Sequence, residues 1–227
     1  MNTSINKAPS VEIWMVRHGE TIFNKKGLVQ GWCDSPLTLN GRHMSACLGL
    51  GLREAEIEFD AIYSSDLTRC IDTAKLIRRS LGSGQSITYD RRLREINTGD
   101  GEGELIENHL KKYPFSLNFK KHPGTPNGET WADVYARVLP ALEDIRQKHQ
   151  SNDGKIKWIL VVAHSMIIAS IVGYLDPTKE EVVPIPNNSV SLFTYKGDAL
   201  TLGDYGNTSY IETGIECSEK YTLNEAV

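Results

Sequence analysis

Five side chains of the sequence have the chemistry needed to bind and cleave a phosphate monoester: Arg17, His18, Arg69, Glu95 and His164. Such an ester carries up to about two negative charges near neutral pH. Two guanidinium groups can hold it through paired hydrogen bonds, which predicts a clamp made of Arg17 and Arg69. A neutral imidazole beside that clamp can attack phosphorus. His18 is therefore the candidate nucleophile and would become a phosphohistidine.

The two remaining side chains suit the other steps of the same reaction. His164 can donate a hydrogen bond to the equatorial oxygens, on which negative charge spreads in the transition state. Glu95 can protonate the leaving alkoxide and later activate water. Because arginine and histidine side chains neutralise the phosphate, this reaction requires no metal ion. An isolated Arg-His-Gly tripeptide is more often a polar turn, so the prediction depends on the combination.

Most of these residues lie close to the ends of predicted strands. Residues 11–16 (VEIWMV), 61–63 and 156–163 (IKWILVVA) are apolar and rich in β-forming side chains, which predicts short buried strands. His18 lies just after the first strand, and His164 directly follows the third. Ligands of open α/β sheets bind at the carboxyl ends of the strands. We therefore expect the candidate site at this edge of the sheet.

Helical segments alternate with these strands, which predicts an α/β fold with a mostly parallel sheet. The near-continuous apolar character of residues 156–163 indicates a strand that is covered on both faces. Asp66, or alternatively Ser65, is a candidate N-cap of the second helix, and Gly82 is its candidate C-terminal stop. The predicted helices cover residues 40–58, 67–81, 131–150 and 166–174, and a further strand covers residues 189–195.

Two segments do not fit this core, which spans roughly residues 11–200. Residues 105–129 contain three prolines and two glycines, which interrupt any long helix, so we expect a lid-like insertion there. Residues 211–227 are mostly polar and are predicted to form a loosely held C-terminal tail. The sequence contains no internal repeat and no long linker. The 227 residues are therefore predicted to form a single domain.

The composition excludes several functional classes. The 25 Lys+Arg and 29 Asp+Glu residues give a net charge of −4, which does not suit nonspecific nucleic-acid binding. The longest apolar run, residues 158–163, is much shorter than the ~20 residues that a membrane span requires. The N-terminus has no apolar segment typical of a signal peptide. The four cysteines form no CxxC pair and no zinc-finger pattern, which predicts reduced thiols in a cytoplasmic protein.

The five candidate side chains lie within a longer pattern of motifs: Arg17-His18-Gly19-Glu20-Thr21, Gln30-Gly31-Trp32, Ser64-Ser65-Asp66-Leu67, Leu93-Arg94-Glu95-Ile96 and Gly128-Glu129-Thr130. This pattern, from about residue 12 to residue 195, resembles the histidine phosphatase superfamily, in the branch of the cofactor-dependent phosphoglycerate mutases and related small phosphatases. The resemblance implies a three-layer α/β/α sandwich. It also implies that His18 is phosphorylated, that the two arginines and His164 complete the phosphate pocket, and that Glu95 donates the proton.

The resemblance further implies that Asn24, Gln30 and Gly31 contact the substrate phosphate. From the residues alone, Asn24 could instead form a turn, and Gln30 could be a solvated loop residue. Ser165 stands where the family usually has glycine, and it could contact substrate or cap the N-terminus of a helix, which we favour. Gly101 stands where an aromatic residue is common in the family, which predicts more room beside the proton donor.

The lid-like insertion at residues 105–129 is rich in basic and aromatic residues. Its lysines could cover a substrate that has a second anionic group, but we favour a solvated basic surface. The aromatic side chains are predicted to anchor the insertion by burial. These residues are Lys111, Lys112, Lys120 and Lys121, with Tyr113, Phe115 and Phe119.

Two enzymatic functions are compatible with this pattern. A phosphatase would hydrolyse a small phosphorylated metabolite without a cofactor, whereas a phosphoglycerate mutase would return the phosphoryl group to a bound sugar acid and use 2,3-bisphosphoglycerate. The choice depends on whether the pocket excludes water until the acceptor is bound. We favour the phosphatase, because the chain is short for the mutase branch and Gly128-Glu129-Thr130 resembles an element common among the phosphatases. An inactive phosphate-binding protein is a third possibility, and a homodimer is compatible with the resemblance.

Overall fold

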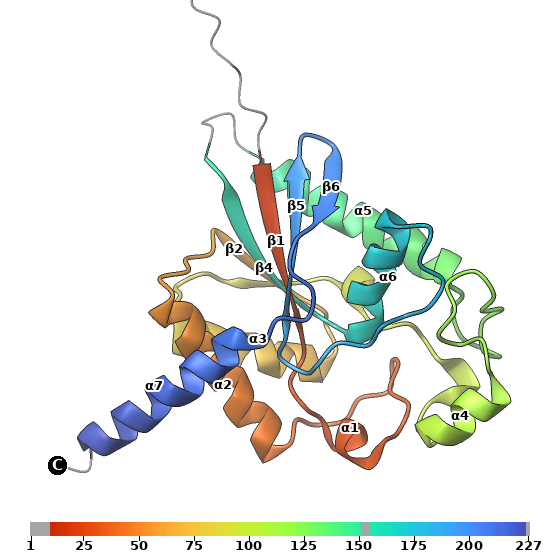
Figure 1. The fold of residues 1–227 in the computed structure, drawn as a ribbon, viewed down its shortest axis with the longest axis horizontal. Helices are drawn as coiled ribbons and strands as arrows, with labels where there is room; N and C mark the ends of the chain where they lie inside the picture. The colour runs from red at the N-terminus through yellow and green to blue at the C-terminus, as the bar shows by residue number, and fades with distance from the viewer. Residues whose placement is uncertain (1–9, 151–154, 226–227) are drawn as a thin grey trace, which may run out of the picture.

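A β-sheet lies at the centre of the molecule (Figure 1). Within residues 10–150 and 155–225, the part of the chain that the computed structural model describes, six strands pair in the order β3-β2-β4-β1-β5-β6. The first four strands in this order are parallel, whereas β5 and β6 run antiparallel to their neighbours. The strands are β1 (Ser10–Arg17), β2 (Ala61–Ser64), β3 (Ile87–Tyr89), β4 (Lys157–Ala163), β5 (Val190–Lys196) and β6 (Ala199–Leu202).

Residues 1–9, on which the prediction of no signal peptide depends, lie outside the described residues, as do residues 151–154 and 226–227. None of the helices in the described part of the chain is long and apolar enough to cross a membrane.

Helices cover both faces of the sheet, because successive side chains of a strand point to opposite sides. Ile13 and Met15 of β1 pack into one core cluster with α5 and α6, while Trp14 and Val16 pack into a second with α2, α3 and α7. Figure 1 shows these two groups of helices on opposite sides of the sheet. The helices are α2 (Leu39–Glu54), α3 (Thr68–Leu81), α5 (Trp131–His149), α6 (Ser165–Leu175) and α7 (Ser209–Glu225). The three-layer α/β/α prediction is therefore confirmed.

The carboxyl ends of the three central parallel strands meet at one edge of the sheet. Arg17 at the end of β1 is in register with Ala163 at the end of β4. The N–H of His18 donates to Ala163 O at 3.0 Å, and the N–H of Ser65 donates to Val162 O at 2.9 Å. The polar residues that follow each strand are thus brought together, as the sequence predicts.

The predicted helices and strands all occur, with ends that differ by a few residues. The predicted cap of α3 is wrong: Leu67 is the N-cap, and it makes no side-chain hydrogen bond. Asp66 does not cap the helix because its carboxylate accepts two hydrogen bonds from Arg94, at 2.6 and 2.7 Å. The predicted stop at Gly82 is confirmed, since this residue adopts the left-handed conformation with φ of 77°.

The prediction of a loosely held C-terminal tail is also wrong. Residues 209–225 form helix α7, which packs closely against α2. Gly51 and Gly214 permit the approach, because a Cβ on either glycine would collide with a backbone oxygen of the other helix. Ile211 and Cys217 are buried there. The prediction was misled by the mostly polar composition, because only a few apolar residues of the segment, such as Ile211, pack against α2, and the two glycines allow the close approach.

The lid-like insertion and the β1–α2 connection each contain a short helix, at the end of the sheet where β1 terminates (Figure 1). The first is α4 (Ile106–Lys112) and the second is α1 (Ile22–Lys26). Leu28 and Leu105 form an isolated β-bridge that joins the two segments. The insertion is thereby placed over the carboxyl edge of the sheet.

Candidate active site

The His18 side chain lies at the centre of the carboxyl edge, directly after β1. Its ring Nδ1 is 2.8 Å from the carbonyl oxygen of Gly19. A carbonyl can only accept a hydrogen bond, so Nδ1 carries the proton and Nε2 keeps its lone pair. Burial, together with the charges of Arg69 and Arg17, lowers the pKa of His18 well below its ordinary value. The ring is therefore neutral at physiological pH and can act as a nucleophile.

The backbone around His18 is fixed by contacts with three distant elements. Asn187 Nδ2 donates to the carbonyl oxygen of His18 at 2.9 Å. The N–H of Gly19 donates to Thr73 Oγ1 at 2.9 Å. A Cβ at position 19 would lie 2.6 Å from Ser45 Oγ, so the close approach of α2 requires glycine there. These contacts position the histidine without touching its ring.

Glu95 is buried, with 6% of its surface exposed. Its carboxyl oxygens accept hydrogen bonds from the N–H groups of Ile96 at 3.0 Å and Met166 at 3.2 Å. Burial raises the pKa of Glu95, although these N–H groups and the charges of the arginines oppose the shift. A raised pKa keeps more of the protonated form near neutral pH, which suits a general acid. Trp32 Nε1 and Arg137 Nη2 both donate to the backbone carbonyl of Glu95, at 2.7 and 2.9 Å, and orient the residue.

Arg69 and His164 lie behind His18 and are fully buried. The guanidinium of Arg69 donates to the carbonyl oxygens of Gly31 at 2.6 Å and Cys33 at 3.0 Å. The rings of His164 and His18 have centroids 5.3 Å apart, and His164 Nε2 is 3.0 Å from the hydroxyl oxygen of Ser65. Burial and the charge of Arg69 lower the pKa of His164 well below its ordinary value. The second histidine is thus neutral too.

A cavity of about 230 Å³ opens beside His18. Six of the nine predicted site residues line it: Arg17, His18, Asn24, Gln30, Glu95 and Ser165. The other three, Gly31, Arg69 and His164, do not reach its wall and form the layer behind it. The structure therefore brings the predicted residues to one place but divides them between the cavity wall and its support.

The loop residues of this wall have structural contacts as well as exposure to the cavity. Asn24 Oδ1 accepts hydrogen bonds from the N–H of Thr21 and from Asn187 Nδ2, both at 3.2 Å. Gln30 Oε1 accepts from the Thr21 hydroxyl at 2.7 Å. Thr21 also caps α1 and thereby shapes the loop. Ser165 is not an N-cap: His164 holds that position.

Comparisons with known proteins identify the family. The model of the histidine phosphatase superfamily, branch 1, matches residues 13–208 of the chain. This chain belongs to the histidine phosphatase superfamily. The match covers every candidate site residue, including His18, Glu95 and both arginines.

Proteins that are similar to this chain carry different names. Phosphoglycerate mutase-like protein 4 of Arabidopsis thaliana is 33% identical over 88% of this chain and 87% of its own length. Probable phosphoglycerate mutase GpmB of Escherichia coli is 31% identical over 82% of this chain and 86% of its own length. The crystal structure of a phosphoglycerate mutase from Bacillus anthracis is similar with a TM-score of 0.82 and 28% identity, covering 92% of this chain and 99% of that one. These similarities fix the family and the fold.

Two positioning residues of this superfamily member were not predicted from the sequence as site residues. Glu102 accepts hydrogen bonds from the N–H groups of the loop that holds Arg69. Asn187, in the segment before β5, links His18 to Asn24. Glu102 directly follows Gly101, a position singled out from the sequence, so its place in the chain was a usable signal. Asn187 lies in a Pro-Ile-Pro-Asn stretch without any chemical pattern, and no sequence signal could have identified it.

In this member of the superfamily the lid-like insertion supplies the outer wall of the cavity, but its lysines do not. The ammonium groups of Lys111, Lys112 and Lys120 form ion pairs with glutamates, and these three side chains are more than half exposed. The prediction of a solvated basic surface is therefore confirmed for these three lysines. Phe119 is anchored against Trp131, with ring centroids 5.0 Å apart. Phe115 is 49% exposed, so the predicted burial of this aromatic is wrong.

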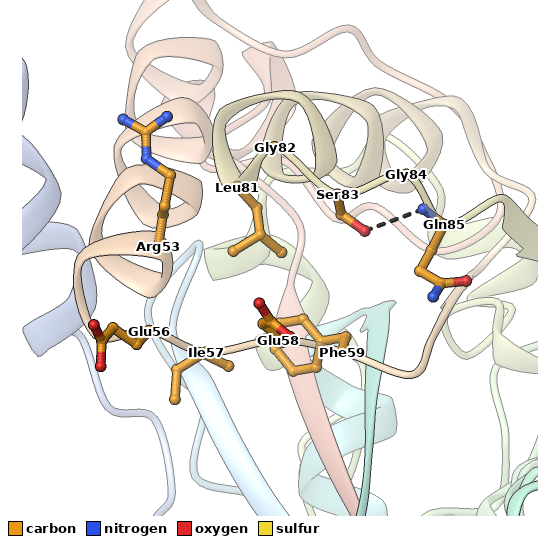
Figure 2. Close-up of a pocket in the computed structure, with 10 residues that line it drawn as sticks. All are labelled: Arg53, Glu56, Ile57, Glu58, Phe59, Leu81, Gly82, Ser83, Gly84 and Gln85. Atoms are coloured by element: carbon orange, nitrogen blue, oxygen red, sulfur yellow. Dashed lines mark hydrogen bonds between the residues drawn. The ribbon is translucent and has the colours of Figure 1, made fainter.

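A larger hollow, of about 710 Å³, lies far from this site (Figure 2). Its walls come from the end of α2, the chain leading into β2, and the turn after α3. These segments lie at the amino ends of the strands, opposite to His18. In Figure 2 a single hydrogen bond, from the N–H of Gln85 to Ser83 Oγ, joins two of the labelled residues. None of the predicted site residues lines this hollow, whose charged side chains are Arg53, Glu56 and Glu58. The cavity beside His18, which six of the predicted site residues line, is therefore the candidate active site.

Proposed function

We propose that this protein is a phosphatase that hydrolyses small phosphate monoesters through a phosphohistidine on His18. The observation that carries the proposal is the pairing of a neutral, buried His18, whose Nε2 is not protonated, with a buried Glu95 of raised pKa on the same cavity wall. One group can attack phosphorus and the other can protonate the leaving group. Together they supply both halves of a monoester cleavage.

In the first proposed step, the Nε2 lone pair of His18 attacks phosphorus. The bond between phosphorus and the ester oxygen breaks, and this oxygen takes the proton of Glu95 and leaves as an alcohol. In the second step, Glu95 accepts a proton from water, the water oxygen bonds to phosphorus, and the P–N bond breaks. Phosphate leaves and His18 is restored. Each bond that forms is matched by one that breaks, and Glu95 returns to its starting state.

The two arginines support this proposal through their charge and their free donors. Arg17 lines the cavity, and Arg69 lies behind it. The Nε–H of each is buried and has no hydrogen-bond partner among the described residues. A buried donor of this kind is costly unless a ligand accepts its hydrogen bond. Phosphoryl oxygens in the cavity would be suitable acceptors for the Nε–H of Arg17, and the charge of Arg69 behind the wall would add to their attraction.

A phosphoglycerate mutase is the second candidate, because relatives such as the Arabidopsis thaliana and Escherichia coli proteins carry mutase names. A mutase would bind 2,3-bisphosphoglycerate and a sugar acid, both of which have a second anionic group. The lysines of the insertion are directed into ion pairs on the outside, so they do not supply the matching positive charge. This arrangement favours the phosphatase.

A paired assay separates these functions. Purified protein is incubated with p-nitrophenyl phosphate, and in parallel with 3-phosphoglycerate in the presence and absence of 2,3-bisphosphoglycerate. Phosphate release from the aryl ester without the bisphosphate supports the phosphatase. Isomerisation that depends on the bisphosphate, with little release, would establish the mutase instead. No turnover of any substrate would indicate an inactive phosphate-binding protein.

The phosphohistidine itself is tested by trapping. After rapid acid-free quenching with labelled ester, wild-type protein should carry one alkali-stable, acid-labile phosphoryl group, and His18→Ala should carry none and lose turnover. His43→Ala is the matched control, because His43 is an exposed histidine of α2. If His18→Ala kept near-normal activity, the proposed mechanism would be wrong.

All four cysteines are free thiols, which supports the further proposal that the enzyme acts in the reducing environment of the cytoplasm.

A further inference from the structure

The outer half of the cavity is formed by side chains of the lid-like insertion, and its character differs from that of the phosphate end. We call this surface the lid wall. It contains no lysine, arginine, aspartate or glutamate, and its members come from α4 and from the chain that follows it. The lid wall comprises Ile106, His109, Leu110, Ser116, Leu117 and His122.

The charges around the lid wall do not suit a second anionic group. Among the described residues that line the cavity, Arg17 is the one lysine or arginine, and it belongs to the phosphate end. Lys111 and Lys112 of α4 pair with Glu107 and Glu104 on the outer surface. A carboxylate against the lid wall would therefore be removed from water without a counter-charge, which is strongly unfavourable.

The polar atoms of the lid wall are suited to hydrogen bonds with hydroxyl groups of a ligand. Ser116 Oγ, His122 Nδ1 and the neighbouring Thr98 Oγ1 are buried and have no hydrogen-bond partner among the described residues. His109 Nδ1 has only a 3.5 Å approach to Glu104 Oε2. That carboxylate favours the proton on Nδ1, which leaves Nε2 of His109 as an acceptor. A hydroxyl can donate to such an acceptor, whereas a carboxylate or phosphate oxygen cannot.

Both histidines of the lid wall are uncharged near neutral pH. Burial lowers the pKa of His109, although Glu104 opposes the shift, and burial also lowers the pKa of His122. Neither ring therefore supplies the positive charge that an anionic leaving group would need.

The position of His109 depends on the unusual glycine at position 101. A Cβ on Gly101 would lie 2.6 Å from both Nδ1 and Cε1 of the His109 ring. No real Cβ tolerates this distance, so any larger residue at 101 would displace the ring. The extra room that Gly101 creates is thus filled by His109, which reaches the cavity from α4. The two residues act as a pair that sets the shape of the lid wall.

The size of the cavity limits the ligand. A volume of about 230 Å³ is at the small end for ligand sites, which usually measure ~300–1,000 Å³. Such a space suits a phosphoryl group with a compact organic group, of the size of one ring or a short chain.

We propose that the lid wall selects monoesters whose organic part is compact, uncharged and partly apolar, and carries a hydroxyl group that donates to His109. The inference rests on the proposed phosphatase function and narrows its substrate class. Apolar parts of the ester would lie against Ile106, Leu110 and Leu117. The hydroxyl would satisfy the polar atoms that lie between them.

A set of three aryl phosphates tests the inference, because their leaving groups have similar basicity and differ at one substituent. 4-Methylphenyl, 4-hydroxymethylphenyl and 4-carboxyphenyl phosphate are compared by kcat/KM at pH 7. The hydroxymethyl ester should be cleaved about fivefold or more better than the methyl ester, as expected for one added hydrogen bond. The carboxy ester should be cleaved at least tenfold worse than the methyl ester.

Variants then assign the selectivity to the lid wall. His109→Phe should reduce the preference for hydroxymethyl over methyl about fivefold, and His109→Gln, which keeps an acceptor, should retain more of it. Gly101→Ala should change the preference in the same direction as His109→Phe. Leu110→Lys should improve cleavage of the carboxy ester relative to the methyl ester at least fivefold. Lys111→Ala, on the outward side of the same helix, should leave all three rates unchanged.

The possible failures are distinguishable. Equal rates for the three esters, or an equal loss on all three in His109→Phe, would overturn the selectivity of the lid wall while leaving the phosphatase intact. No phosphate release from 4-methylphenyl phosphate, together with no phosphorylation of His18, would overturn the proposed function and this inference with it.

Discussion

The carboxylate of Glu102 provides the sharpest test of how the site is held together. It accepts hydrogen bonds from the N–H groups of Gly31, Trp32 and Cys33, at 3.0, 2.7 and 3.1 Å. The carbonyls of Gly31 and Cys33 in turn accept hydrogen bonds from Arg69. Glu102 thus holds the loop through its N–H groups, and the carbonyl groups of the same loop hold the buried Arg69.

Glu102→Ala removes the shared acceptor of these three backbone donors. An unsatisfied buried donor costs about 1–3 kcal/mol. Since Glu102 is only partly buried, water will reach some of the donors. We therefore expect a loss of about 2–4 kcal/mol in the free energy of unfolding. Glu102→Gln keeps one acceptor oxygen and should lose about half as much.

Because Glu102 is ionisable, the difference in stability between wild type and its variants should depend on pH. Burial by itself would raise its pKa, but hydrogen bonds from the Cys33 side chain and from the loop N–H groups outweigh this effect and lower the pKa overall. A carboxyl group with a lowered pKa in the folded state contributes stability above its ordinary pKa. This contribution is lost as the pH falls through the lowered value, so wild type and Glu102→Gln should converge in strong acid.

The assay combines urea unfolding with the binding of orthovanadate, which occupies phosphate sites. The unfolding free energies should rank wild type above Glu102→Gln above Glu102→Ala. Vanadate should bind more weakly to folded Glu102→Ala, because Arg69 is less well positioned. Glu104→Ala is the control, since that neighbouring carboxylate pairs with the exposed Lys112. A change of less than about 0.5 kcal/mol in Glu102→Ala, or unchanged vanadate affinity, would refute the reasoning.

Three other expectations follow from the site and the fold. Glu95→Gln should slow the cleavage of alkyl phosphates more than that of aryl phosphates. In wild type the phosphorylation rate for an alkyl ester should fall as the pH rises through the raised pKa of Glu95. Equal losses on both esters in single-turnover assays would argue against its role as the acid. Gly214→Ala should destabilise the protein by about 1–3 kcal/mol in urea, because α7 can no longer approach α2, whereas Gly84→Ala, where a Cβ meets nothing within 4 Å, should have little effect. EDTA should leave aryl phosphatase activity intact, and strong inhibition that added metal reverses would contradict the proposed mechanism.

The core of the fold could be predicted because its signals are local. Residues 11–16 and 156–163 are apolar strands that stop at polar residues, and Gly82 ends a helix through its own backbone freedom. Helix α7 could not be predicted in the same way. Its residues are mostly polar, and it is held by a close approach to α2 at Gly51 and Gly214 together with the packing of a few apolar side chains such as Ile211. This contact is tertiary, so no pattern within the segment reveals it.

The candidate site shows the same division. Arg17, His18 and Glu95 were predicted by their position and chemistry, and all three line one cavity. The burial of Arg69 and His164 behind the cavity wall was not predicted, because it depends on loops that fold over them from elsewhere in the chain. Asn187 was missed for the same reason: its contact with His18 spans a long stretch of sequence and follows no motif.

The charge of the site explains how an acidic protein can bind an anion. The net charge of −4 belongs mainly to the surface, whereas the cavity and the layer behind it hold Arg17 and Arg69 close to a single buried carboxyl group, Glu95. Burial lowers the pKa of Arg17 and raises that of Glu95, so it disfavours the charged form of both groups. A bound phosphate stabilises the charged form of the arginines, and Glu95 can stay protonated. The same burial that makes the empty site costly therefore favours the combination of a charged clamp, a neutral nucleophile and a protonated acid that monoester cleavage needs.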